Sequence, residues 1–474
     1  MRLKIPIAGR SFVWELTARA ARGIVLVVAI PLAIDHWFRY VPSYLIGSQE
    51  YLQAALAISH GNYFAVDNGF RPPLFPLLLA AAGENLQVMF AIHLVIGIVV
   101  SLLLFEIFNL ITGRPAIGVV VAIVYNLNPS TAQFQAWALA ETLTTLFVTA
   151  GSLFAVRTCC HRSRLVPGVL LTSLFFSLAS LTRPEWQLMP LVVTAAVLIL
   201  RSRSQSAPLA GRQILRGVVA GLLPFVLLII GWSTVNLVRF NWFQFSTLTG
   251  YDMTQFFGPY FSEAPARDKK LADIFLRYRA IHLRTTSWPF DIIWEARPAM
   301  LKATGMTDAQ MSRELLRICF RIFLRHPGAY FKLAGRAFKV FWRPPLYARG
   351  CNWEDFRKGL REVLAGRASW LKRLYAYIYL PFEYAYALAL IGPFFWRRWR
   401  PLLWSPGLLM LNVVILYEAV LSSLGNPEDN NRYKVPVESL ILGIAILLIY
   451  LLLRNFGRRR NEDAAPAGLQ PSLP

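Results

Sequence analysis

The sequence predicts an all-α protein that crosses a membrane several times. Hydrophobic residues make up 56% of the chain and charged residues only 16%, whereas soluble globular domains carry about a quarter charged residues. Apolar runs recur along the chain, and arginines gather in alternate loops between them. A helix of about 20 mostly apolar residues crosses the hydrocarbon core, so these runs indicate a polytopic membrane protein rather than a soluble enzyme.

The apolar runs predict about ten spans. The first of them, which follows basic residues, resembles a secretory signal, but it leads into Asp35-His36-Trp37 without a small-residue cleavage site. We therefore expect an uncleaved span. The predicted spans cover residues 17–36, 89–111, 115–132, 138–156, 166–182, 186–200, 217–238, 375–396, 402–424 and 435–453.

Positive charge predicts the orientation of these spans. The formal net charge is +23, and in a membrane protein such an excess is expected in cytoplasmic loops and near lipid headgroups, so we expect no nucleic-acid partner. Arginines fill the loops at 114, 157–164, 201–216, 397–400 and 454–460. These loops and both termini are therefore predicted to be cytoplasmic.

Two long segments are predicted on the outer side. The first is the loop 37–88, in which residues 73–82 are apolar but too short to span and suit a surface or re-entrant helix. The second is the region 239–374, where residues 311–345 alternate apolar and basic residues at the spacing of interfacial helices. The expected organisation is a transmembrane module 1–238 that contains the first loop, an outer interfacial region 239–374, C-terminal transmembrane helices 375–454 and a disordered cytoplasmic tail 455–474.

Ionisable residues are distributed unevenly between the two sides. Acids and arginines mix at the outer ends of the spans, whereas the inner ends carry mainly arginine, which predicts a polar site at the outer boundary. The alternative is that helix ends simply tolerate charge. The outer set comprises Asp35, Glu50, Asp67, Glu84, Glu141, Arg183, Glu185, Asp252, Glu383, Glu418, Glu428, Asp429, Arg432 and Glu438.

Several segments together resemble the GT-C glycosyltransferases that use polyprenyl-phosphate sugars, such as protein O-mannosyltransferases and the lipid A aminoarabinose transferase. The first loop carries EYLQAALAISHGNYF and DNGFRPPLFPLLLAAAG, which are similar to the first outer loop of that family. Further similar segments follow in order: LNPSTAQFQAWALAETLTTLF, SLASLTRPEWQLMPL, WSTVNLVRFNWFQFSTLTGYDM, RHPGAYFKLAGRAFKVFWRPP and NRYKVPVE.

The resemblance implies a bacterial inner-membrane enzyme whose site faces the periplasm or exterior. It would transfer a sugar from a polyprenyl-phosphate donor to a glycan, lipid or protein acceptor. Such transfer needs a carboxylate near the acceptor hydroxyl and cations for the departing phosphate. Arg71, before the double proline, matches the family's phosphate-facing position, although it also suits an anchor at headgroups. Glu141, Arg183, Glu185, Arg432 and Tyr433 are the other substrate-binding candidates. Glu141, Arg432 and Tyr433 equally suit a structural role, whereas Arg183 and Glu185, which flank Pro184, better suit a structural role that shapes the cavity.

One position departs from the family pattern. In the GT-C family the first-loop motif usually begins with an acid, in a D-S-x-x-Y or D-E-x-x-Y setting. The corresponding residues of this chain are Gly47-Ser48-Gln49-Glu50-Tyr51. Three explanations are open. Glu50 replaces the acid from one helical turn further on, Asp67 or Asp35 replaces it from elsewhere, or the chain has lost activity. Glu50 and Asp67 are therefore the candidate catalytic residues.

The sequence leaves the metal requirement and the exact function open. Some relatives hold a divalent cation through carboxylates, but no ligand set is evident here, and His60 and His93 lack ligand-spaced partners. The competing functions are a glycan polymerase or ligase that uses lipid-diphosphate-linked glycans, a non-catalytic family member or partner subunit, and a transporter. A transporter would show paired repeats, which the sequence lacks.

Overall fold

The computed structural model describes residues 2–7, 10–44, 47–63, 69–204, 208–286, 288–343, 380–427 and 430–463, with their side chains described between Leu16 and Arg454 except those of Leu380 and Arg398. The candidate acid Asp67 lies outside the described residues. So do Glu428 and Asp429, most of the C-terminal third of the region 239–374, and the end of the predicted tail.

Helices make up nearly all of the described regular structure. They are α1 (Ala18–Arg39), α2 (Ser48–Ser59), α4 (Leu74–Ala81), α5 (Leu86–Thr112), α6 (Pro115–Leu127), α7 (Pro129–Ala136), α8 (Glu141–Cys159), α9 (Leu165–Ser180), α10 (Met189–Arg203), α11 (Gly211–Pro224), α12 (Gly231–Phe240), α13 (Thr249–Phe257), α14 (Lys269–Thr285), α15 (Ile292–Thr304), α16 (Asp308–Arg325), α17 (Pro327–Phe341), α20 (Leu380–Phe395), α21 (Arg400–Leu403), α22 (Pro406–Gly425) and α23 (Val435–Asp463). Short 3-10 turns cover Pro184–Trp186, Gly258–Glu263, Ala266–Asp268, Arg397–Trp399 and Arg432–Lys434, and a π-helix, Phe225–Ile230, joins α11 to α12.

A small hairpin at the N-terminus departs from the all-α prediction. Strands β1 (Arg2–Ile7) and β2 (Arg10–Glu15) pair antiparallel, with Arg2 opposite Glu15 and Ile7 opposite Arg10. The sequence Arg-Leu-Lys-Ile alternates polar and apolar residues at the period of a strand. The prediction treated this stretch only as a basic flank of the first span, so it missed the hairpin.

The all-α membrane character is confirmed, but the count of ten spans is not. Six helical segments are long and apolar enough to cross a membrane: Leu86–Thr112, Glu141–Cys159, Pro184–Arg203, Gly211–Phe240, Pro406–Gly425 and Arg432–Arg454. A seventh would be the pair α6 and α7, which bends by 54°. The break falls at Asn128-Pro129, because proline has no amide hydrogen to continue a helix.

The other three predicted spans also fall on helices, but these do not meet the same test. They are α1, α9 and α20, and the last two have only 16 residues each. At 1.5 Å per residue, such a helix extends about 24 Å, which is less than the thickness of the hydrocarbon core.

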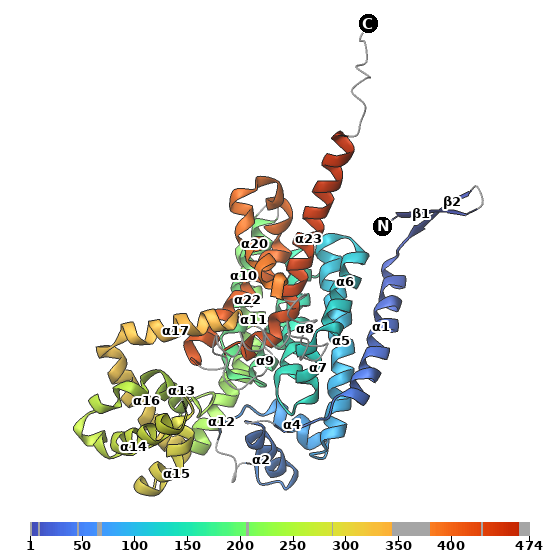
Figure 1. Ribbon diagram of the computed structural model, residues 1–474. Coiled ribbons are helices and arrows are strands. Elements are labelled where there is room, and N and C mark those ends of the chain that lie inside the picture. Colours follow the sequence, from blue (N-terminus) through green and yellow to red (C-terminus); the bar gives the residue numbers. More distant parts are fainter. Residues whose placement is uncertain are drawn as a thin grey trace.

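The helices form a bundle, with helices of the segments 37–88 and 239–343 gathered at one end (Figure 1). The most enclosed candidate span is α8, in which 78% of the membrane-length window is buried. In Figure 1, α1 begins and α23 ends toward the upper end of the bundle, whereas α2, α4 and α13 to α16 lie at its lower end. Helices α13 to α17 share a second apolar core that includes Tyr251, Phe261, Met300 and Leu315.

Candidate functional site

The segment before α4 is held at the lower end of the bundle by backbone contacts on two sides. The Leu74 amide donates to the Leu181 carbonyl at 3.0 Å, at the end of α9. On the other side, the Thr247 amide donates to Gly69 O at 3.0 Å and the Ser246 hydroxyl donates to Phe70 O at 2.7 Å. These contacts place Arg71 between the end of α9 and the loop that leads into α13.

Glycine is required at position 69 in this segment. Its φ is +72°, and an added Cβ would lie 2.6 Å from Cε2 of Phe240. Only a residue without a side chain lets the segment approach the end of α12 this closely.

Arg71 meets Glu50, the candidate catalytic acid on α2. The Glu50 carboxylate accepts from Nη2 of Arg71 at 2.5 Å and from its Nε at 2.7 Å. The guanidinium also lies over the Tyr51 ring, 4.8 Å from its centroid. Both charged side chains are about a quarter exposed, at 24% and 26%. The structure thus brings together two of the predicted site residues in a solvent-accessible ion pair.

Gly47 lies directly beside this pair. It precedes α2 in the left-handed conformation, with φ +91°, and an added Cβ would meet only Nη2 of Arg71, at 3.4 Å. The Cβ position of residue 47 therefore faces the guanidinium that Glu50 contacts, and this backbone conformation would strain any residue other than glycine. The geometry fits the explanation in which Glu50 takes the place of the missing acid.

A second group of charges is buried around Glu141, at the start of α8. Arg183 Nη1 donates to Glu141 Oε1 at 2.9 Å, and Arg432 pairs with the same oxygen. Arg183 Nε also lies 2.5 Å from Glu185 Oε1. Glu141 has no exposed surface and Arg183 is only 7% exposed. One buried carboxylate therefore joins the turn before α10 to the start of the last helix.

Two tyrosines connect these groups. The Arg183 guanidinium lies 4.3 Å from the centroid of the Tyr433 ring, and Tyr433 OH accepts from Asn426 Nδ2 at 3.1 Å. Burial raises the pKa of Tyr51, which also lies within electrostatic range of Arg71 and Glu141. We call this set the charge cluster. It comprises Glu50, Tyr51, Arg71, Glu141, Arg183, Glu185, Asp252, Arg432 and Tyr433.

Asp252 belongs to the outer set of ionisable residues, but the sequence did not make it a catalytic or substrate-binding candidate. It is a partly buried residue of α13, and among the described residues no hydrogen bond or ion pair to its side chain is found. Burial raises the pKa of Asp252 to about 7; Arg71 opposes this shift, and Glu50 and Glu185 reinforce it. A carboxyl group that titrates near neutral pH is suited to accept a proton.

The remaining candidates do not join the charge cluster in the described structure. Asp35 pairs with Arg39 on its own helix, at 2.6 Å. Asp67 cannot be placed, since it lies outside the described residues. Across the part of the chain that the structure describes, no group of three or more His, Cys, Asp or Glu residues could hold a metal ion.

The charge cluster combines two chemical capacities at one end of the bundle. Arg71, Arg183 and Arg432 can bind a phosphate or carboxylate through charge-assisted hydrogen bonds. The unpaired carboxyl of Asp252 can take up a proton near neutral pH. Comparison with protein-family models, curated proteins and solved structures finds no match for this chain.

Proposed function

We propose that this chain is a membrane glycosyltransferase that moves a sugar from a polyprenyl-phosphate donor to an acceptor glycan, lipid or protein. The observation that carries the proposal is Asp252, an unpaired carboxyl with a pKa near 7, beside the charge of Arg71. A base and a phosphate-binding cation at the end of a membrane-embedded bundle suit a lipid-phosphate donor. The site would face the outer side of a bacterial plasma membrane, with both termini in the cytoplasm.

The proposed reaction is a single in-line displacement. Asp252 accepts the proton of an acceptor hydroxyl as its oxygen forms a bond to the anomeric carbon. The bond from that carbon to the phosphate oxygen breaks, and the polyprenyl phosphate leaves with the electron pair. Arg71 stabilises the departing phosphate, and Arg183 and Arg432 contribute positive charge behind it. The product has the inverted anomeric configuration.

Glu50 has a supporting part in this proposal. It neutralises Arg71 in the absence of donor, through contacts of 2.5 and 2.7 Å. The buried Glu141 aligns Arg183 and Arg432, and Tyr433 and Glu185 fix the position of Arg183. Asp67, which lies outside the described residues, stays a candidate acid of this loop.

The experiment measures transfer from radiolabelled polyprenyl-phosphate sugars in membranes that contain the full chain. Asp252→Asn should lower the maximal rate about 10²-fold or more, the usual contribution of a general base. Arg71→Gln should chiefly raise the donor KM. The matched controls are Asp273→Asn and Arg284→Gln, two exposed residues of α14 outside the charge cluster, which should leave both constants unchanged.

Two outcomes would contradict parts of this proposal. Wild-type transfer that Asp252→Asn leaves intact would refute Asp252 as the base. An absence of transfer from every polyprenyl-phosphate sugar would refute the enzyme assignment for this donor class.

A non-catalytic partner subunit is the second candidate function, and Gly47 is the observation that favours it. A parallel assay with lipid-diphosphate-linked glycans tests the polymerase or ligase alternative. Transfer from these donors alone would favour that alternative, and inactivity with both donor classes would favour the non-catalytic one.

A further inference from the structure

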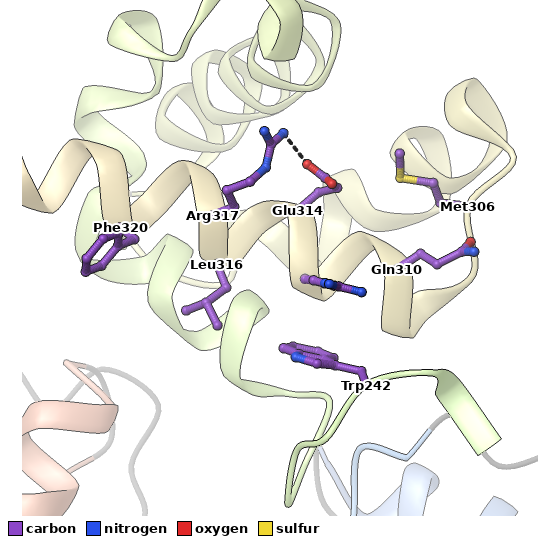
Figure 2. Close-up of a pocket in the computed structure, with 8 residues that line it drawn as sticks. Trp242, Met306, Gln310, Glu314, Leu316, Arg317 and Phe320 are labelled. Atoms are coloured by element: carbon purple, nitrogen blue, oxygen red, sulfur yellow. Dashed lines mark hydrogen bonds and ion pairs between the residues drawn. The ribbon is translucent and has the colours of Figure 1, made fainter. Parts of the chain in front are cut away.

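A large cavity lies outside the charge cluster, between α16 and the chain that follows α12. Its volume is about 850 Å³, which falls in the range of small-molecule binding sites. Figure 2 shows Trp242 on one side of α16 with Leu316, whereas Arg317 and Glu314 pair on the other side of the helix. The walls also include Gln310, Arg313 and Phe320.

Arg313 is the cation in this cavity that lacks a neutralising partner. Arg317 pairs with Glu314 and, at 2.7 Å, with Asp268 Oδ1. Arg313 is exposed, and among the described residues no carboxylate or carbonyl contacts it. The cavity therefore offers a free guanidinium to an anion.

The polarity of the cavity changes along α16. Gln310 and Arg313 lie toward the start of the helix, and Leu316 and Phe320 follow Arg313 by one and two turns. Met306, before the helix, and the paired Glu314 and Arg317 complete the lining. The apolar surface continues beyond the cavity, because Phe320 is 59% exposed and Leu324 is 64% exposed. A site that is cationic at one end and opens onto exposed apolar side chains matches an amphiphile with an anionic head.

Trp242 places this cavity next to the membrane. It follows α12 by two residues, and α12 ends the long apolar segment Gly211–Phe240, in which only 28% of the membrane-length window is buried inside the protein. The rest of that segment is left to face lipid. Tryptophan is enriched at the level of lipid headgroups, where its ring has an apolar body and a polar edge.

We propose that this cavity binds an anionic phospholipid of the surrounding bilayer. The phosphate group lies at Arg313, the Trp242 indole lies beside the headgroup, and the acyl chains run along Leu316, Phe320 and Leu324. The site is separate from Arg71 and does not depend on the proposed transferase activity. A zwitterionic lipid, which has no net negative charge, binds there less tightly.

The test is direct binding of short-chain fluorescent phosphatidylglycerol and phosphatidylcholine to the purified full chain in detergent. Wild type should bind phosphatidylglycerol more tightly. Arg313→Gln should raise its Kd about fivefold to tenfold, as expected when one charge-assisted contact is lost. Arg313→Lys should retain most of the affinity, and Trp242→Ala should weaken the binding of both lipids.

The controls separate a built site from general attraction to positive charge. Arg284→Gln removes one exposed arginine from α14, outside the cavity, and should leave the Kd unchanged. Equal weakening in Arg284→Gln and Arg313→Gln would refute the site, as would unchanged binding in Arg313→Gln. A polyprenyl monophosphate that displaces phosphatidylglycerol at a much lower concentration would refute the phospholipid assignment and make the cavity an isoprenoid-phosphate site.

Discussion

Removing the carboxylate of Glu141 should destabilise the protein far more than removing that of Glu50. In Glu141→Gln, Arg432 loses its partner and Arg183 keeps only Glu185, so buried guanidinium groups are left without full compensation. Breaking a buried ion pair by removing one member costs about 3–5 kcal/mol. Glu50→Gln breaks a pair that is about a quarter exposed, for which about 0–1 kcal/mol is the usual value.

These free energies correspond to a measurable difference in melting temperature. The entropy of unfolding is about 2 cal/mol/K per residue near 60 °C, or about 1 kcal/mol/K for a chain of this length. Glu141→Gln should therefore lower the Tm by about 3–5 °C, and Glu50→Gln by about 1 °C or less. The assay is thermal unfolding of the purified full chain in one detergent, followed by intrinsic fluorescence.

A double variant sharpens the test. Glu141→Gln combined with Arg432→Gln removes the charge that the single change leaves unpaired, so it should be more stable than Glu141→Gln alone. The difference is the coupling energy of the pair. If Glu141→Gln and Glu50→Gln lower the Tm equally, or if the double variant loses the sum of both single effects, the argument from buried charge is wrong.

Three further predictions concern other parts of the structure. The pKa of Asp252 is about 7 in the folded chain and ordinarily 3.8, so ionisation favours the unfolded state as pH rises between these values. The Tm of Asp252→Asn should therefore increase relative to that of wild type from pH 5 to pH 8, and a Tm difference that stays constant over this range would contradict the argument. Gly250→Ala should cost about 1–3 kcal/mol, since its Cβ would lie 1.8 Å from Ser312 O, whereas Gly335→Ala on α17, with open space around it, should be neutral or stabilising in the same melting assay. Lys434→Met should lower the Tm by a few degrees because it leaves the buried Glu383 without its ion-pair partner, and the change Glu383→Leu in the same chain should restore part of the loss.

The hydrophobic pattern predicted where helices form better than how long they are. All ten predicted spans fall on helices, because apolar runs of this kind have no other stable form in a bilayer. The pattern could not show that α9 ends at Ser180, or that the chain bends by 54° at Asn128-Pro129. Pro129 accounts for the position of the bend. The bend angle and the end of α9, where the Leu181 carbonyl accepts a hydrogen bond from the distant Leu74, are features of the tertiary structure.

The sequence predicted most residues of the candidate site, but not which of them contact one another. Sidedness and motif order singled out Glu141, Arg183 and Arg432, which the structure joins although Glu141 and Arg432 are 291 positions apart. Motif order also singled out Arg71, which pairs with Glu50. Asp252 lay in a segment that already resembled the GT-C family, and no local pattern marked it. Its place beside Arg71 depends on the loop before α13 folding back onto Phe70, which only the tertiary structure reveals.

The ion pair between Arg71 and Glu50 makes the basicity of Asp252 dependent on the occupant of Arg71. In the unliganded chain the Arg71 charge lowers the pKa of Asp252, and Glu50 and Glu185 raise it. An anion bound to Arg71 would neutralise the positive charge that lowers the pKa of Asp252. Its own negative charge would raise that pKa further. Under the proposed function, donor binding would then increase the proton affinity of Asp252 before the acceptor oxygen attacks the anomeric carbon. The proton affinity of Asp252 is therefore tied, through this one salt bridge, to whatever occupies Arg71.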